Sequence, residues 1–172
     1  MKNLSLLILV TLTGCLKTTT FNEINPKGEY TVLLPDYLSA TGGIHKQASL
    51  QYQNEEKEVY ALVIDEKKAD LEAYDMKYNL DTYYENVVSK PFTETLQNAK
   101  VNAPGRQDIN GNKALVAEIT GTLNGVGVYY KLAIIETETK FYQVLTWTRA
   151  DRKEKYENDL TRIIETLKVR AE

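Results

Sequence analysis

Hydrophobic and polar residues alternate most clearly in two runs that meet at Asn124-Gly125, within residues 115–134. An Asn-Gly pair favours the positive φ angles of a type I′ turn, which joins two antiparallel strands through a two-residue loop. Such a loop fixes the register of the whole hairpin. The other face then carries Glu118 opposite Lys131, a favourable pair. On the first face the register predicts five non-polar pairs: Leu115 with Ile134, Ala117 with Leu132, Ile119 with Tyr130, Gly121 with Val128, and Leu123 with Val126.

Shorter alternating runs predict further strands on either side of this hairpin. Pro35 ends the first, and Pro104-Gly105 interrupts an edge strand. Two runs, 58–64 and 126–135, are apolar at both parities, which is typical of strands covered on both faces. The loop 36–47 follows the first strand. The predicted strands cover residues 29–34, 48–53, 58–64, 101–110, 115–123, 126–135 and 141–148.

Two stretches repeat apolar residues at helical spacing. The first covers residues 80–96 and contains Pro91, so we expect a kink near Val87 or a restart at Pro91. The second follows Asp151, which with Glu154 predicts an Asp version of the capping box. A helix that binds a partner would share this amphipathic pattern, but packing on the sheet is the commoner explanation. The apolar positions of the second helix are Tyr156, Leu160, Ile163, Ile164 and Leu167.

This order of elements predicts an α+β fold, in which an antiparallel sheet of six to seven strands lies between helices in a three-layer α/β/α arrangement. Several runs resemble the PsbP and Mog1-like superfamily. The resemblance covers roughly residues 28–169 and implies the same sandwich. Known members are mainly non-enzymatic accessory or protein-binding modules, but no binding residue of theirs matches here. The runs are EYTVLLP (29–35), ASLQY (48–52), EVYALVI (58–64) and FYQVLTWT (141–148).

The first residues predict export and lipidation. Residues 4–12 are mainly apolar and follow Lys2, but nine residues cannot span a bilayer, which takes about 20. The segment therefore reads as a secretory signal. Its end, Leu12-Thr13-Gly14-Cys15, resembles the lipobox of bacterial lipoproteins, which implies cleavage between Gly14 and Cys15 and a lipid on the Cys15 sulfur. Cys15 is the only cysteine, so lipidation would account for an exported thiol, the alternative being an incidental buried cysteine on an uncleaved tail.

These observations divide the chain into a signal peptide (1–14), a lipidated tether (15–27) and one PsbP/Mog1-like domain (28–172). Cleavage would leave 158 residues with a net charge of −4 and no Lys/Arg cluster, which argues against nucleic-acid binding. Lipoproteins bound for the cell exterior can carry an acidic run after the cysteine, and none follows Cys15. By that analogy we expect the periplasmic face of the outer membrane.

Residues with obvious chemistry are few. His45 is the only histidine and lies beside Gly42-Gly43, but no neighbouring residue completes a metal site, so we expect a solvated loop histidine. Asp65–Asp75 holds seven charged residues among eleven without the glycine of a calcium loop, which favours a solvated loop. Glu136 and Glu138 fall in a predicted turn, and we expect both to be solvated.

Three functions follow from these residues. The first is a membrane-anchored, non-enzymatic accessory module that binds another envelope protein, for which the 12 tyrosines would suit an interface. The second is a periplasmic small-ligand or metal-ion binder whose pocket opens at the 36–47 loop. The third is an enzyme. The sequence contains no phosphate-binding glycine loop and no Gly-x-Ser-x-Gly motif, although carboxylates distant in sequence can still meet in the fold. We predict no enzyme, no metal site and no cofactor beyond the lipid on Cys15.

Overall fold

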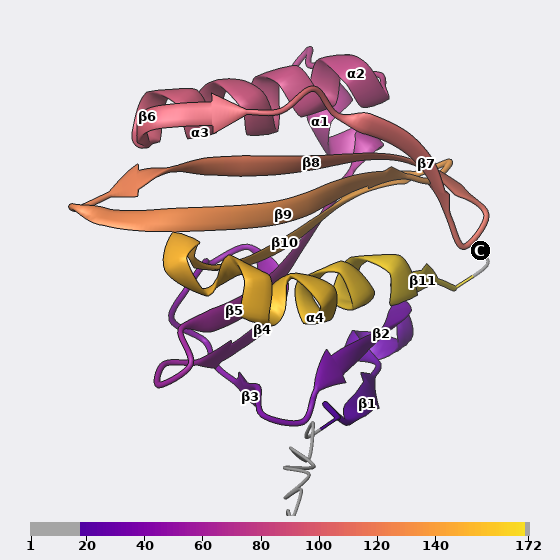
Figure 1. The fold of residues 1–172 in the computed structure, drawn as a ribbon. Coiled ribbons are helices and arrows are strands. Elements are labelled where there is room, and N and C mark those ends of the chain that lie inside the picture. The colour runs from indigo at the N-terminus through magenta and orange to yellow at the C-terminus, as the bar shows by residue number, and fades with distance from the viewer. Residues whose placement is uncertain (1–17, 171–172) are drawn as a thin grey trace, which may run out of the picture.

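A computed structural model describes residues 18–170 of the chain. At its centre lies an eight-stranded antiparallel sheet in the order β3-β4-β5-β10-β9-β8-β6, with β7 also paired to β8 (Figure 1). The predicted α+β fold with an antiparallel sheet between helices is confirmed, but the sheet has eight strands and not the predicted six to seven. The strands are β3 (Ser39–Ala40), β4 (Ala48–Asn54), β5 (Val59–Lys67), β6 (Gln97–Val101), β7 (Gly105–Ile109), β8 (Asn112–Leu123), β9 (Val126–Glu136) and β10 (Lys140–Arg149).

The β8-β9 hairpin has the predicted register along its whole length. Asn124 and Gly125 have φ angles of 51° and 80°, as a type I′ turn requires. All five non-polar pairs are cross-strand partners. Glu118 faces Lys131 on the other side, with 3.5 Å between carboxylate and ammonium. The turn chemistry and the hydrophobic pattern therefore specify the same alignment.

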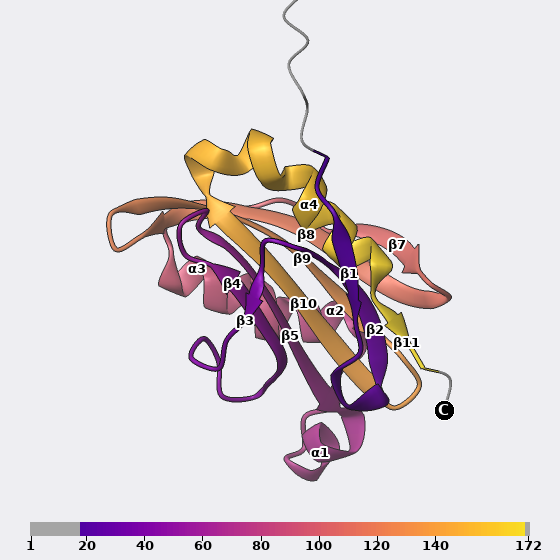
Figure 2. The same ribbon diagram turned by 90° about the horizontal axis from the view of Figure 1, so that it is seen from below.

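Helices and a small second sheet cover the two faces of the large sheet (Figures 1 and 2). A continuous helical run lies on one face and α4 lies on the other, beside the three-stranded sheet β1-β2-β11. Each face has its own hydrophobic core. The run consists of α2 (Leu80–Tyr83), the π-helix η2 (Tyr84–Ser89) and α3 (Lys90–Thr95). The remaining elements are β1 (Phe21–Ile24), η1 (Pro26–Gly28), β2 (Tyr30–Pro35), α1 (Lys68–Ala73), η3 (Ala150–Arg152), α4 (Lys153–Thr166) and β11 (Lys168–Val169).

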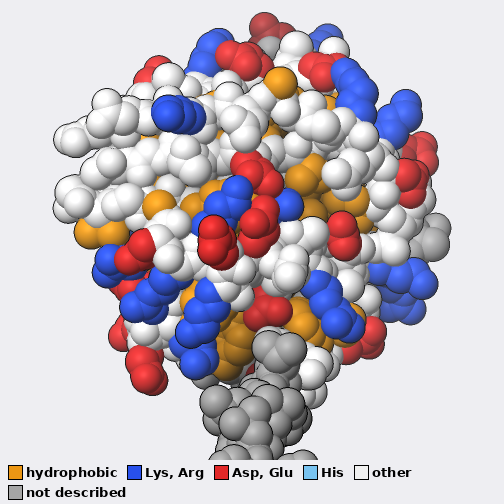
Figure 3. Space-filling model, in the orientation of Figure 1, with side chains coloured by type: hydrophobic (Ala, Val, Ile, Leu, Met, Phe, Trp, Pro, Cys, Tyr) orange, Lys and Arg blue, Asp and Glu red, His pale blue; other side chains and the backbone are white. Residues whose placement is uncertain are grey.

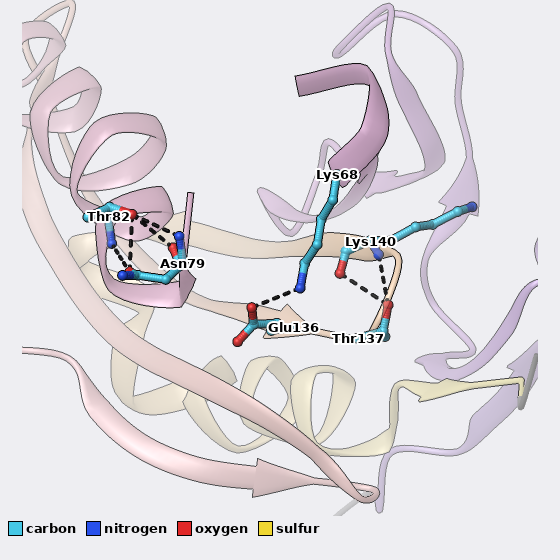
Figure 4. A network of polar contacts seen from close by, with 6 residues as sticks. All are labelled: Lys68, Asn79, Thr82, Glu136, Thr137 and Lys140. Atoms are coloured by element: carbon cyan, nitrogen blue, oxygen red, sulfur yellow. Dashed lines mark hydrogen bonds and ion pairs between the residues drawn. The ribbon is translucent and has the colours of Figure 1, made fainter. Parts of the chain in front are cut away.

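The predicted irregularity of the first helix is a π turn just before Pro91. Proline has no N–H group, and its ring crowds the carbonyl four residues earlier, that of Val87. A π turn spaces its hydrogen bonds over five residues, so the helical run passes through the proline without ending. At the start of α2, the Asn79 side chain accepts from the Thr82 N–H (2.9 Å) and Thr82 Oγ1 accepts from the Asn79 N–H (3.0 Å), a capping box seen in Figure 4.

The closing helix α4 buries its predicted apolar face, but its predicted capping box is wrong. All five apolar residues of that face are buried. The helix begins at Lys153, after η3, and no side chain caps it. Asp151 instead accepts two hydrogen bonds from the Arg149 guanidinium, at 2.9 and 3.1 Å. Such charge-assisted bonds are stronger than neutral ones, and they take the carboxylate away from the helix end.

Three segments expected to be irregular contain strands or a helix. Within the predicted loop 36–47, Ser39–Ala40 forms β3 and pairs with β4. Phe21–Ile24, which we placed in the tether 15–27, forms β1 and pairs with β2, so the ordered part begins before Gly28. Within the charged run Asp65–Asp75, the first three residues continue β5 and the next six form α1. Pairing with β10 extends as far as Lys67, because backbone hydrogen bonds do not require apolar side chains. The predicted loop is therefore wrong for these nine residues, although none of the side chains in the run is buried.

Candidate functional site

The residues singled out from the sequence do not form a common site. Gly14 and Cys15, the predicted cleavage and lipidation residues, lie outside the described residues. His45 is exposed, and its Nδ1 accepts a hydrogen bond from the Gln47 N–H at 3.3 Å. Across residues 18–170 no three His, Cys, Asp or Glu side chains gather where they would hold a metal ion.

The two carboxylates of the β9-β10 turn are separate. Glu136 lies 2.9 Å from the Lys68 ammonium, and only about a quarter of each side chain is exposed (22% and 25%), so its predicted solvation is wrong. Figure 4 shows this pair beside the turn, where Thr137 Oγ1 accepts from the Lys140 N–H (2.9 Å). Glu138 is exposed. The turn therefore brings no carboxylate pair together.

A polar cluster beneath α2 was not visible in the sequence. The Tyr83 hydroxyl donates to Glu66 and accepts from Gln143 Nε2 (2.9 Å). Burial raises the pKa of Tyr83, and the Glu66 carboxylate raises it further, so the phenol is neutral and acts as the donor. Tyr83 also stacks on Phe141, with ring centroids 4.2 Å apart. Because its hydroxyl both donates and accepts within the cluster, the cluster fastens α2 to the sheet.

An apolar cleft of about 290 Å³ lies between α3 and the same face of the sheet. Its lining contains Leu62 and Leu145, which are cross-strand partners on β5 and β10. Because β10 lies between β5 and β9 near the middle of the sheet, the cleft adjoins the core beneath the helical run. The lining residues are Ile44, Leu62, Pro91, Phe92, Thr95, Leu96, Leu123, Tyr130, Leu145 and Trp147.

A row of aromatic rings borders this cleft. Tyr60, Trp147 and Tyr130 are cross-strand neighbours on β5, β10 and β9. The Tyr60 and Trp147 ring centroids lie 4.9 Å apart and nearly parallel, and those of Trp147 and Tyr130 lie 5.7 Å apart. Phe92 of α3 meets Tyr130 edge-on at 4.8 Å. Each such contact is worth about 0.5–1.5 kcal/mol beyond burial, so the rings stabilise one another's positions.

The loop 36–47 reaches the mouth of the cleft through Ile44, not through His45. The Gln51 side-chain oxygen on β4 accepts from the N–H groups of Ile44 (2.9 Å) and His45 (2.8 Å). These two bonds hold the loop against the sheet, with Ile44 among the lining residues. The loop was therefore placed correctly beside a pocket, although its conspicuous histidine has no part in it.

The cleft is uncharged. None of its lining residues is an Asp, Glu, Lys, Arg or His. Burial raises the pKa of Tyr130 and of Tyr60, and Glu58 and Glu55 add to the effect at Tyr60, so both phenols stay neutral. A charged ligand would lose its hydration there without finding a partner. The geometry thus suits an uncharged, apolar group.

A second hollow of about 260 Å³ adjoins the cleft and shares Leu123 and Trp147 with it. Here the lining includes Glu58 and Arg149, whose charged groups lie 3.6 Å apart. The second hollow is therefore partly charged, unlike the cleft.

Three solved structures are similar in fold. Cyanobacterial PsbP (CyanoP) from Synechocystis sp. PCC 6803 has a TM-score of 0.61 at 13% identity, over 94% of this chain and 99% of that one. LpqN of Mycobacterium tuberculosis, involved in cell envelope biogenesis, has a TM-score of 0.60 at 11% identity, over 88% of this chain and 91% of that one. The Saccharomyces cerevisiae Ran-binding protein Mog1p has a TM-score of 0.59 at 9% identity, over 88% of this chain and 96% of that one. The chain therefore has a PsbP/Mog1-like fold.

Sequence comparison adds nothing to this likeness. No protein-family model matches the chain, and no curated protein matches its sequence. Between residues 18 and 170, no helix is both long enough and apolar enough to cross a membrane.

Proposed function

We propose that this chain is a membrane-anchored lipoprotein of the bacterial cell envelope and a non-enzymatic accessory module that binds another envelope protein through the apolar cleft. The lipobox-like residues 12–15 support the anchor. The fold supports a binding role by analogy with a Ran-binding protein, and an envelope role by analogy with LpqN, which is involved in cell envelope biogenesis. The observation that carries the proposal is the uncharged cleft beside Trp147.

The composition of the cleft favours an apolar side chain of a protein over a small molecule. Small-molecule sites usually enclose about 300–1,000 Å³ and place several polar groups that orient the ligand. This cleft has about 290 Å³, and its only polar side-chain atoms are the hydroxyls of Thr95 and Tyr130 and the indole N–H of Trp147. Protein interfaces commonly seat one or two apolar anchors in such a pocket, against tryptophan and tyrosine.

Site-specific photo-crosslinking in intact cells tests this binding. A photo-reactive residue at Thr95, on the rim, should give one reproducible protein adduct, whereas the same residue at Asn22, on the other face of the molecule, should not. Ile44→Asp places a carboxylate at the mouth without entering the core and should reduce the adduct at least tenfold. Met76→Asp, an equal change at an exposed residue outside the cleft lining, is the control. An adduct that survives Ile44→Asp would show that the cleft is not the binding site.

The second candidate is a periplasmic small-ligand binder that uses the same cleft. It is favoured by one observation, the position of Ile44 from the 36–47 loop at the mouth. Uncharged apolar compounds should then raise the melting temperature, because a ligand at 100 times its Kd stabilises by about 2.7 kcal/mol. The described residues offer no ligand set for the metal-ion version of this function.

The lipid anchor is tested separately. Cys15→Ala should move the protein from the membrane to the soluble fraction, because each acyl methylene contributes about 0.8 kcal/mol of membrane affinity. Unchanged fractionation would contradict the anchor. Protease protection in whole cells, lost when the outer membrane is permeabilised, would support the periplasmic face of the outer membrane.

A further inference from the structure

The chain is fastened to the domain from Thr19 onward. Thr19 Oγ1 donates to Asp159 Oδ2 on α4 (3.2 Å), and the Tyr37 hydroxyl donates to the same oxygen (2.8 Å). The Asp36 N–H donates to the Thr20 carbonyl (2.8 Å), and the next residues form β1. Figure 2 shows β1 beginning beside α4, on the face of the large sheet opposite α2 and α3.

This attachment leaves little free chain before the domain. Four peptide units separate the Cα atoms of Cys15 and Thr19, and a fully extended chain spans about 3.3–3.6 Å per residue. The two atoms are therefore at most about 14 Å apart. Since an acylated Cys15 lies at the headgroup layer, Thr19 stays within about 14 Å of the membrane surface. Asp159 of α4, whose carboxylate accepts from the Thr19 hydroxyl, lies close to it.

The surface around Thr19 carries cations stacked on aromatic rings. Figure 3 shows Lys and Arg side chains on both sides of the place where the described chain begins, with hydrophobic atoms between them. We call this surface, made of Phe21, Tyr37, Lys57, Lys155 and Arg162, the anchor surface; the ring of Tyr156 is buried beneath it. Arg162 lies 4.3 Å from the ring centroid of Phe21, Lys155 lies 5.1 Å from that of Tyr156, and Lys57 lies 5.7 Å from that of Tyr37.

The three cations are available to an outside partner. Within residues 18–170 none of them is in an ion pair. Acidic residues lie close by along the chain and offset part of the positive charge: Glu23, Asp36, Glu56 and Glu58 beside Lys57, and Glu154 beside Lys155. Long cationic side chains and aromatic rings with apolar bodies favour the boundary between lipid and water, where the cations meet headgroup phosphates.

We propose that the anchor surface lies against the phospholipid headgroups of the membrane that holds Cys15, so that the cleft points away from that membrane. The inference rests on the proposed lipid anchor. It gives the two faces of the sheet different contacts, because the α4 face meets lipid and the α3 face meets the protein partner. A freely swinging domain would show no such preference.

Tryptophan quenching in vesicles tests the orientation, because Trp147 is the chain's only tryptophan and lines the cleft. The lipidated full-length product is purified, its N-terminal peptide is weighed by mass spectrometry, and it is placed in phosphatidylethanolamine/phosphatidylglycerol vesicles with a nitroxide on the headgroup. A second protein, Phe21→Trp with Trp147→Phe, moves the probe to the anchor surface. The headgroup nitroxide should quench position 21 at least threefold more strongly than position 147. Circular dichroism confirms that both proteins are folded.

A charge change then separates contact from mere proximity. In the Phe21→Trp protein, Lys155→Gln with Arg162→Gln should reduce quenching by about half, whereas Lys90→Gln with Lys100→Gln, the same charge change on α3 and β6, should leave it unchanged. Equal quenching at positions 21 and 147, or equal effects of the two charge pairs, would overturn the orientation while the anchor stands. A Cys15 peptide without added lipid mass would refute the proposed anchor and this inference with it.

Discussion

Gly121→Ala should destabilise the protein by displacing Leu96. A Cβ atom at Gly121 would lie 2.8 Å from Leu96 Cβ, 3.1 Å from its Cδ1 and 3.2 Å from the Gln97 carbonyl oxygen. Carbon atoms pack best at about 3.5–4.0 Å. Because Leu96 Cβ is bonded directly to the backbone, no rotamer change relieves the closest contact. The chain between α3 and β6 must therefore move.

The cost follows from measured overpacking in other cores, about 1–3 kcal/mol. For a domain of this size each kcal/mol lowers the melting temperature by about 2–4 °C. We therefore expect a fall of about 2–12 °C, measured by circular dichroism and checked by urea unfolding. The change should also narrow the cleft, since Leu96 lines it.

Gly42→Ala is the matched control, because nothing lies within 4 Å of a Cβ at that position. Its melting temperature should stay within about 2 °C of the wild type, as for most surface substitutions. A Gly121→Ala protein as stable as the Gly42→Ala protein would refute the packing argument at β8 and with it the position of α3 over the sheet.

Two further changes probe the hairpin and the charged network. Gly125→Ala places a side chain at φ 80° in the type I′ turn and should cost about 1 kcal/mol in urea unfolding; an unchanged midpoint would contradict the turn type. At Asp65, burial alone would raise the carboxyl pKa, but hydrogen bonds from Lys140 and Ser49 outweigh it, so the pKa lies below its ordinary value. The unfolded chain then binds more protons, so Asp65 stabilises the fold above its unfolded pKa of about 3.9 and this stability is lost as the pH falls through the folded value. Asp65→Asn should reduce the loss of unfolding free energy as the pH falls below about 4, near the unfolded pKa of the carboxyl group. A variant that loses stability as steeply as the wild type in this range would count against the Lys140 contact.

The sequence predicts the centre of the fold well because local chemistry decides it. Asn124-Gly125 favours a type I′ turn, the turn fixes the register of the hairpin, and that register places the five predicted apolar pairs on one face. The apolar face of α4 follows equally from its spacing. Pro91 predicts an irregular helix because proline lacks a backbone N–H whatever its surroundings.

Long-range contacts account for what the sequence does not reveal. Phe21–Ile24 becomes a strand because β2 offers a free edge, and a four-residue run carries too little periodicity to be recognised. The cleft has the same origin. Its lining residues, such as Ile44, Phe92 and Trp147, come from segments far apart in the chain, and each looks like ordinary core or loop on its own. His45 drew notice for its chemistry, although its neighbour Ile44 is the residue in the cleft.

The π turn before Pro91 determines which way the following side chains point. In a regular α-helix each residue advances about 100°, so Phe92 and Leu96 would stand about 120° and 160° around the axis from Leu80. A π-helix holds more residues per turn, so each of the six residues of η2 rotates by less than 100° about the axis. Phe92 and Leu96 are thereby turned back toward the side of the helix that faces the strands. The wall of the cleft that contains Phe92 and Leu96 thus depends on the change of helical rotation in η2, one turn earlier in the chain. This change lies next to Pro91, which is itself exposed.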